Sequence, residues 1–279
     1  MVKQNLKVID SIIQKIKSER RLDFSQYRKP LLARRIATRA LLAKRPNLEE
    51  YLELLESDPA EMDFLVDKIT INVTELFRDP KVFDSLRTKV IPEILNLKKY
   101  SSGGEIRIWS SACATGREAY SVLILLLEIL GSSYDPDRIK LLGTDIDENS
   151  IEDARTFSIA DSEIVSLRED FRALCRKNLE PKEGEGWSLP EKLRKSVNFV
   201  RHDLTKELRA EIFDLILCRN VFIYFERNLQ LLVMRRIFEK LYDNGYLVMG
   251  LVESVPDEMR GLFDLSDANL RIFRKGKSG

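Results

Sequence analysis

Histidine, cysteine and glycine are scarce in this chain, and long apolar runs are missing. The 279 residues include one histidine, His202, which nearly excludes Ser-His-Asp catalysis and histidine-ligated metal sites. The three cysteines lack Cys-x-x-Cys spacing, which argues against a disulfide framework and a zinc centre. No apolar run approaches the roughly 20 residues needed to cross a bilayer, and the amino terminus lacks a signal-peptide pattern. We therefore expect a cytoplasmic protein with no bound metal and no membrane insertion.

A nucleotide-binding pattern without its usual glycines occupies residues 106–154. An apolar strand at 106–109 leads into a small-residue loop at 110–116, a long helix and a second strand ending in Asp145. This order is typical of a βαβ unit, with an ordinary crossover as the alternative. The loop has one glycine and no Gly-x-Gly-x-x-Gly, and Glu118 would repel phosphate but attract an ammonium group. Because the Asp145 carboxylate can accept both ribose hydroxyls, the pattern favours S-adenosylmethionine over a dinucleotide.

The charge is unevenly distributed, although the net charge is only +1. Residues 1–45 contain 13 Lys and Arg residues against three acids. A concentrated positive field attracts acidic partners. Within a predicted helix beginning near Pro30, Arg34, Arg35 and Arg39 form a basic cluster. The alternative is that this cluster pairs with the acidic segment 49–63.

The order of the expected elements divides the chain. Residues 1–75 contain no glycine and show helical periodicity, and residues 76–104 form a linker helix and loop. Residues 105–279 then alternate strands and helices, which predicts a doubly wound α/β sheet with its ligand at the carboxyl ends of the strands. A small insertion is expected at 157–196. Strands are expected near 106–109, 140–144, 197–201, 213–218, 246–251 and 270–274, and helices at 79–99, 118–130, 150–155 and 229–241.

Four separated segments carry a family resemblance. Residues 70–79, 106–121, 143–147 and 217–225 resemble the CheR family of chemotaxis receptor methyltransferases, which esterify glutamate side chains on receptor cytoplasmic domains. Residues 27–36 resemble the first domain of that family, so the match runs from about residue 8 to residue 275. The resemblance implies a small all-helical amino-terminal domain and a Rossmann-like methyltransferase domain. It also implies S-adenosylmethionine as cofactor, S-adenosylhomocysteine as product and acidic helical hairpins of chemoreceptors as partners.

The resemblance also implies roles for individual residues. Glu118 would hold the methionine ammonium and Asp145 the ribose, although Asp145 could instead cap the following helix. Tyr224, Arg219 and Arg78 would lie beside the reacting groups as catalytic residues, and Tyr224 is preferred next to the reacting oxygen. Receptor docking would fall to Arg34, Arg35 and Arg39. The implied cofactor-binding residues are Asn72, Thr74, Arg78, Glu118, Asp145, Asp203, Leu204, Arg219 and Asn220.

Several departures from the family pattern leave other functions open. Ala112, Ala114, Arg117 and Ala119 replace residues that are usual in the cofactor loop, and the usual histidine is absent from residues 250–254. Ala112 adds a methyl group near the expected cofactor, and Arg117 puts a cation beside Glu118. The alternatives are a noncatalytic CheR-like protein that binds nucleoside or receptor, and a methyltransferase with another substrate. No nucleic acid partner is expected, because aromatic residues do not alternate with the basic ones.

Overall fold

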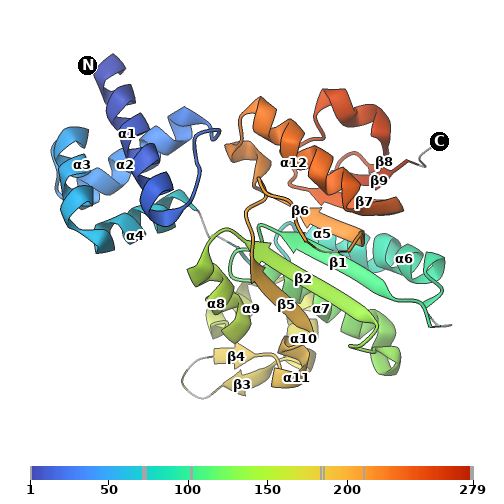
Figure 1. Ribbon diagram of the computed structural model, residues 1–279. Helices are drawn as coiled ribbons and strands as arrows, with labels where there is room; N and C mark the ends of the chain where they lie inside the picture. The colour runs from blue at the N-terminus through green and yellow to red at the C-terminus, as the bar shows by residue number, and fades with distance from the viewer. Residues whose placement is uncertain are drawn as a thin grey trace. The chain divides into compact units, whose positions relative to one another are not determined.

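The chain forms two compact units, shown in Figure 1. The computed structural model describes residues 2–70, 74–100, 103–182, 184, 186–209 and 211–276. The helical unit contains Met1–Asn72 and Phe222–Leu232, and the sheet unit contains Val73–Val221 and Val233–Gly279. Among the described residues, no helix has the length and apolar character needed to cross a membrane.

Four helices make up the amino-terminal part of the helical unit. They are α1 (Val2–Arg20), α2 (Lys29–Leu42), α3 (Leu48–Ser57) and α4 (Pro59–Ile69). The apolar residues of α1 and α2 recur at helical spacing, and most of those expected to face inward are buried. Asn47 accepts a hydrogen bond from the Glu50 amide at 2.8 Å and thereby caps α3, while Asp58 caps α4. The helical periodicity predicted for this part of the chain is confirmed.

A distant segment completes the helical unit. The 3₁₀ turn η4 (Phe222–Tyr224) and the start of α12 (Arg227–Glu239) belong to it. The Arg28 amide donates to the Tyr224 carbonyl at 2.8 Å, and the Glu226 amide donates to the Gln26 carbonyl at 3.0 Å. The ring of Phe225 packs edge-on against that of Tyr27 at 5.1 Å. Residues nearly 200 positions apart therefore share one small core.

The sheet unit is built on a seven-stranded, mostly parallel sheet. The strand order is β5-β2-β1-β6-β7-β9-β8, with β9 antiparallel to β7 and to β8. The predicted fold class, a doubly wound Rossmann-like sheet with a small helical domain, is confirmed. Because β1 lies between β2 and β6, the strand order reverses direction at β1, and ligands bind at such switch points. The strands are β1 (Ile106–Ser111), β2 (Ile139–Asp145), β5 (Val197–Arg201), β6 (Phe213–Cys218), β7 (Leu241–Met249), β8 (Phe263–Asp267) and β9 (Ile272–Lys275).

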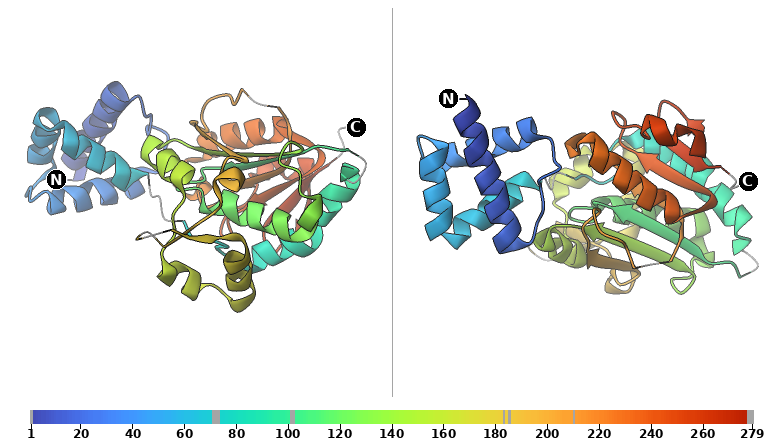
Figure 2. Two further views of the ribbon diagram at one scale, coloured as in Figure 1. Left: turned by 90° about the horizontal axis from the view of Figure 1, so that it is seen from below. Right: turned by 45° about the horizontal axis from the view of Figure 1, so that its top comes forward.

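Helices cover both sides of this sheet, as the left view of Figure 2 shows. On one side lie α7 (Arg117–Leu130), α8 (Glu148–Thr156) and the consecutive turns α5 (Pro80–Ser85), η1 (Leu86–Val90, π-helical) and α6 (Ile91–Leu97). On the other side lies α12. The nine consecutive residues from Glu118 to Leu126 are all buried, which makes α7 the central helix of the unit. Short 3₁₀ turns are η3 (Gly131–Ser133) and η5 (Asp257–Leu262).

Two boundaries differ from those expected. Strand β8 was not predicted, because Phe263-Asp-Leu-Ser-Asp alternates weakly, and only Phe263 in it is buried. Strand β7 begins at Leu241, where the helical pattern of α12 was expected to continue. Gly245 follows, and β6 pairs with β7 through a register irregularity between Phe213 and Leu215. The strand pairing therefore overrides the local helical pattern at this point.

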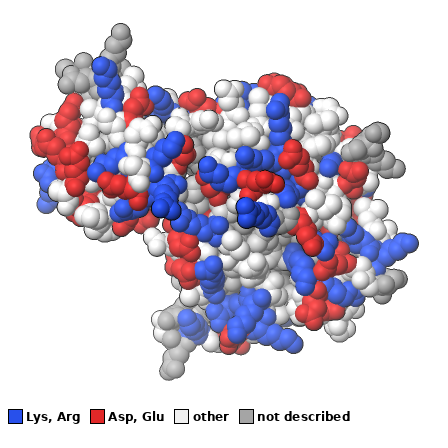
Figure 3. All heavy atoms as spheres, viewed as in Figure 1, with Lys and Arg blue, Asp and Glu red and all other residues white. Residues whose placement is uncertain are grey.

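The connection from β5 to β6 leaves part of the sheet open. In residues 202–209 and 211–212, which the structure describes, no helix forms. Val197 and Phe199 of β5 are buried on one face, whereas Asn198 and Val200 are exposed on the other. Around this open face, Lys, Arg, Asp and Glu side chains border uncharged surface (Figure 3). This open face forms a groove lined by residues of both charges, so the groove is neither acidic nor basic as a whole.

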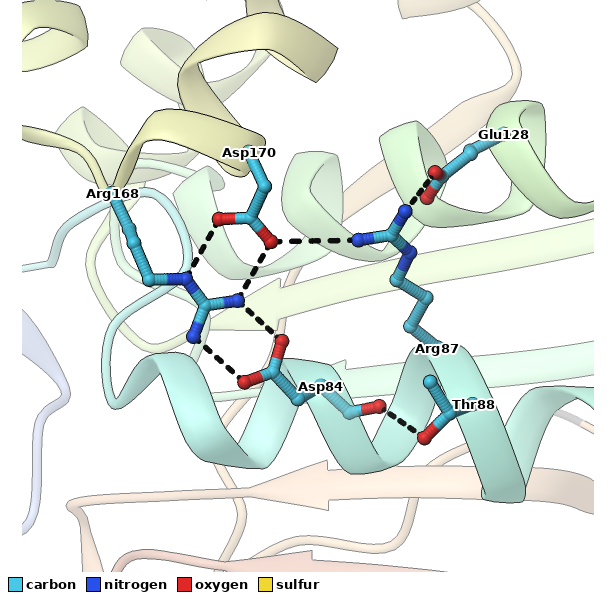
Figure 4. Close-up of polar contacts among 6 residues, drawn as sticks. All are labelled: Asp84, Arg87, Thr88, Glu128, Arg168 and Asp170. Atoms are coloured by element: carbon cyan, nitrogen blue, oxygen red, sulfur yellow. Dashed lines mark hydrogen bonds and ion pairs between the residues drawn. The ribbon is translucent and has the colours of Figure 1, made fainter.

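The insertion at residues 157–196 contains α9 (Asp161–Ser166), α10 (Glu169–Asn178), α11 (Glu191–Arg194) and a hairpin of β3 (Glu180–Lys182) and β4 (Gly186–Ser188). An ionic network ties it to the rest of the sheet unit (Figure 4). Arg168 contacts Asp84 of α5 at 2.5 Å and Asp170 of α10 at 2.7 Å. Arg87 contacts Asp170 and Glu128 of α7. The insertion is therefore linked to two helices of the sheet unit.

Candidate functional site

The loop between β1 and α7 is held in a strained conformation. Ala112 and Ala114 adopt φ values of 53° and 48°, and Gly116 adopts 78°. A left-handed backbone costs a residue with a side chain about 1–2 kcal/mol, whereas glycine adopts it freely. Glycine is required at 116, because a Cβ there would lie 2.9 Å from the Cβ of Ala154. The Cys113 amide donates to the Thr144 carbonyl at 2.9 Å, which fixes the loop against β2.

Asp145 ends β2 and faces this loop. Its carboxylate accepts hydrogen bonds from the Ala114 amide at 2.8 Å and from the Asp147 amide at 3.1 Å. The side chain is buried, and burial raises the pKa of the Asp145 carboxyl above its ordinary value. The cap of α8 is Asp147, which accepts from the Asn149 amide, so capping does not account for Asp145. Each carboxylate oxygen offers two acceptor positions, so Asp145 keeps capacity for a diol.

Glu118, in the first turn of α7, is linked to Arg219. Its Oε1 accepts from the Ser110 hydroxyl at 2.7 Å, and its Oε2 accepts from Nη1 of Arg219 at 3.0 Å. Nη2 of Arg219 donates to Asp79 Oδ2 at 2.6 Å and to the Arg78 carbonyl at 2.9 Å. Arg219 is therefore a buried cation shared between two carboxylates. Its Nε has no hydrogen-bond partner among the described residues.

The segment that precedes α5 approaches the same region. Phe77 and Asp79 adopt φ values of 52° and 60°, and such conformations persist where the surrounding structure enforces them. The Phe77 amide donates to the Ser121 hydroxyl at 2.9 Å, which joins the segment to α7. Arg78, between the two strained residues, and Thr74 are half-buried. The predicted residue Asn72 lies outside the described residues.

Glu253 is a buried residue that sequence reasoning did not select. Its Oε2 accepts the amides of Asn220 and Gly250, both at 2.8 Å. Asn220 adopts a φ of 62°, so this carboxylate holds the loop after β6 in a left-handed conformation. A Cβ at Gly250 would lie 2.9 Å from the backbone nitrogen of Asn220 and 2.6 Å from Glu253 Oε2, and the contact with the backbone explains the glycine. The available signal was an acid in an otherwise apolar stretch directly after a buried strand.

Asp203 and Leu204 follow β5. Asp203 accepts from the Thr205 amide at 2.8 Å, and Leu204 is buried. The His202 amide donates to the Asp145 carbonyl at 2.7 Å, which brings this turn next to the end of β2. Partial burial lowers the pKa of His202. The carboxyl ends of the parallel strands thus bring together the predicted residues Glu118, Asp145, Asp203, Leu204, Arg219 and Asn220.

The three arginines of α2 in the helical unit differ in their surroundings. Arg34 is exposed. Arg39 binds both oxygens of Glu61, at 2.7 and 2.5 Å, and Tyr51 donates to the same carboxylate at 2.8 Å. For Arg39, pairing with the acidic segment 49–63 is therefore what the structure shows. Arg35 is buried, and its guanidinium lies over the ring of Tyr224.

Comparison with known families identifies the chain. A family model described as the all-alpha domain of CheR methyltransferase matches residues 7–70. The model of the S-adenosylmethionine-binding domain of CheR methyltransferase matches residues 72–272. The chain belongs to the CheR methyltransferase family. The cofactor of this family's second domain is S-adenosylmethionine.

Curated relatives of CheR type cover most of the chain. The chemotaxis protein methyltransferase of Listeria monocytogenes is 30% identical, over 86% of this chain and 87% of that protein. The chemotaxis protein methyltransferase of Borreliella burgdorferi is 29% identical, over 84% and 83%. An uncharacterized 104.1 kDa protein of Rhodobacter capsulatus is 29% identical over 92% of this chain. The matched region makes up only 26% of that longer protein. Among solved structures, TrmN from Thermus thermophilus covers 66% of this chain and 47% of its own, with 14% identity and a TM-score of 0.36.

The charged residues at the carboxyl ends of the parallel strands fit a sulfonium nucleoside. The buried carboxylates of Glu118 and Asp145 outnumber the buried cation Arg219, which suits a positively charged ligand without phosphate. The substitution at Arg117 does not place its charge on Glu118. Arg117 instead binds both oxygens of Glu163 in α9, at 2.7 and 3.0 Å, and contacts the Thr115 hydroxyl at 2.6 Å. Glu118 therefore stays available to an ammonium group.

Proposed function

We propose that this CheR-family protein transfers a methyl group from S-adenosylmethionine to glutamate side chains of chemoreceptor cytoplasmic domains. The supporting observation is the pair of buried acids, Glu118 and Asp145, at the switch point of a sheet whose connecting loop offers no phosphate cradle. Relatives of similar length are named chemotaxis protein methyltransferases, which supports a chemoreceptor substrate. The expected cytoplasmic location is part of the proposal.

The reaction requires alignment rather than proton transfer. A glutamate carboxyl, with an ordinary pKa near 4.3, is already ionised at neutral pH, so no general base is needed. S-adenosylmethionine supplies the methyl group. The incoming carboxylate oxygen forms a bond to the methyl carbon in line with the breaking carbon–sulfur bond, whose electron pair stays on sulfur. Fixing this geometry can contribute several kcal/mol, and it does not need the single histidine.

We assign the role of Glu118 from its contacts and the roles of the other cofactor-binding residues from the family resemblance. Glu118 would hold the ammonium, because Ser110 and Arg219 fix its orientation and leave lone pairs free. Asp145 would hold the ribose, and Asp203 and Leu204 the adenine edge. Thr74, Arg78, Asn72 and Asn220 would complete the cofactor site.

Among the three residues proposed as catalytic, the contacts suggest different tasks. Arg219 is already engaged by two carboxylates, so we assign it to holding Glu118 and Asp79 in place. We assign Arg78 to orienting the incoming carboxylate. Tyr224 would donate a weak hydrogen bond to the reacting oxygen, since a stronger grip by a cation would reduce its nucleophilicity.

The decisive assay is incubation with radiolabelled S-adenosylmethionine and receptor cytoplasmic fragments. A glutamate methyl ester releases its label as methanol in mild base. We expect base-labile label with the wild type and much less with Glu118→Ala, and the exposed variant Glu191→Ala serves as control. Base-stable label would indicate nitrogen methylation and refute the glutamate assignment.

A noncatalytic binding protein is the second candidate. The strained Ala112 and Ala114 favour it, because both lie in the loop next to Asp145 where glycine would be less costly. Calorimetric titration with S-adenosylhomocysteine separates the candidates. Binding together with turnover supports the enzyme, whereas absence of heat at high protein concentration supports a scaffold.

A further inference from the structure

Arg35 occupies an environment unlike that of a docking residue. It is 9% exposed, whereas its neighbour Arg34 is exposed to solvent. Its Nη1 donates to the carbonyl of Ile69, at the end of α4. Its guanidinium carbon lies 4.7 Å from the centre of the Tyr224 ring, within the range of a cation–π contact. The charge of Arg35 is therefore turned inward.

Tyr224 is held by the helical unit from several directions. Its carbonyl accepts from the Arg28 amide at 2.8 Å. The next residue, Phe225, forms a β-bridge with Tyr27 and accepts from Nε of Arg28 at 3.2 Å. These bonds fix the backbone on both sides of the ring, and the guanidinium of Arg35 contacts the ring itself. The position of the Tyr224 ring is thus determined by Arg35 of α2 and by Tyr27 and Arg28, which directly precede α2.

We propose that Arg35 is a positioning residue that fixes the ring of Tyr224 for methyl transfer, and that it does not bind the acidic substrate. This inference rests on the proposed function, in which Tyr224 lies next to the reacting oxygen. A planar guanidinium can stack on a ring and donate to a carbonyl at the same time, whereas a lysine ammonium cannot reproduce this geometry. The shape of Arg35 therefore matters more than its charge.

Arg34 provides a matched control, because it is adjacent in sequence and carries the same charge at the surface. An exposed cation that attracts an acidic partner should affect the KM for receptor, and its effect should fade with salt. A residue that positions a catalytic group should affect kcat, with little dependence on salt. The two neighbouring arginines are therefore expected to differ in which kinetic constant they change.

The test measures methylation of a receptor fragment by the full chain and the variants Arg34→Ala, Arg35→Lys, Tyr224→Phe and Arg35→Lys/Tyr224→Phe at two salt concentrations. We expect Arg35→Lys to lower kcat about tenfold at unchanged KM, because small misplacements at a reacting centre are costly. Arg34→Ala should raise KM only, and less so at high salt. In the Tyr224→Phe background, Arg35→Lys should lower kcat no further. Each of the two changes would already abolish the contribution of a correctly positioned Tyr224 hydroxyl.

Three outcomes would overturn the inference. Normal kcat in Arg35→Lys would show that the charge alone suffices. A salt-dependent rise in KM with unchanged kcat would make Arg35 a docking residue. Additive losses in the double variant would show that Arg35 does not act through Tyr224. Thermal unfolding of each variant identifies losses that come from misfolding, and absence of base-labile label with the wild type would refute the proposed function instead.

Discussion

Ion pairs that contain a buried glutamate serve differently in the two units of this protein. At the carboxyl edge of the sheet, Arg219 holds Glu118 and Asp79, and the carboxylates keep lone pairs for a ligand. In the helical unit, the bidentate pair of Arg39 and Glu61 leaves little capacity for anything else. Ion pairs of the same kind thus leave acceptor capacity at the proposed cofactor site in one unit and close a core in the other. A paired carboxylate can bind a ligand only if its ion-pair partner leaves some of its hydrogen-bond acceptor positions unoccupied.

The largest expected effect tests the cation at the sheet edge. Arg219→Ala should reduce the free energy of unfolding by about 3–5 kcal/mol, because two carboxylates would lose their buried partner. It should also weaken S-adenosylhomocysteine binding, since Glu118 would no longer be oriented. Chemical unfolding and calorimetry measure the two effects. Arg39→Ala is the comparison: it should lower stability and leave nucleoside affinity unchanged, and equal loss of affinity in both variants would contradict the contrast.

Asp145 separates ligand binding from folding. Asp145→Ala should weaken S-adenosylhomocysteine binding by about 1.5–3 kcal/mol, the value of hydrogen bonds to a charged group. Asp147→Ala, two residues away, should cost about 1 kcal/mol of stability as a lost helix cap and leave affinity intact. Calorimetry and thermal unfolding distinguish them. An unchanged affinity for S-adenosylhomocysteine in Asp145→Ala would show that Asp145 does not bind the cofactor.

Acidification should weaken nucleoside binding through the same carboxyl. Burial raises the pKa of Asp145, so its ionised form is lost at a higher pH than for an ordinary aspartate as the pH falls. Below that raised pKa the group binds a proton and can no longer accept both hydroxyls. Calorimetric affinities across mildly acidic pH should show the decline. An unchanged pH profile in Asp145→Asn would assign the decline to another group.

The smallest expected effect concerns the strained loop. Ala112→Gly should stabilise the protein by about 0.5–1 kcal/mol, because relief of the left-handed backbone exceeds the added entropy of the unfolded chain. It should also tighten nucleoside binding slightly. Ala119→Gly, in the helical part of α7, is the control and should destabilise. A destabilised Ala112→Gly would show that the alanine methyl group contributes packing.

Much of the fold could be predicted from the sequence, because local periodicity determines it. The strands β1, β2, β5 and β6 and the helices α7 and α8 follow from apolar runs and turns, and the acids at the end of β2 and at the start of α7 are visible in the sequence. The short hairpin of β3 and β4 was not predicted. Pairing of the arginine cluster with the acidic segment 49–63 was one expected alternative, but the individual partner of each arginine was not predictable. Arg35 meets Tyr224 and Arg39 meets Glu61 only after folding, because such contacts depend on tertiary packing. The role of Glu253 was hidden for the same reason.

The segment 222–232 has a practical consequence for exchanging parts between relatives. Phe24 and Tyr27 in the amino-terminal quarter share a core with Phe225, so that quarter is not a separable module. A chimera that transplants only the first 72 residues would combine the amino-terminal helices of one parent with segment 222–232 of the other parent. If the proposed receptor preference is to be transferred by recombination, two exchanged segments should be required, one at the amino-terminal end and one around Tyr224.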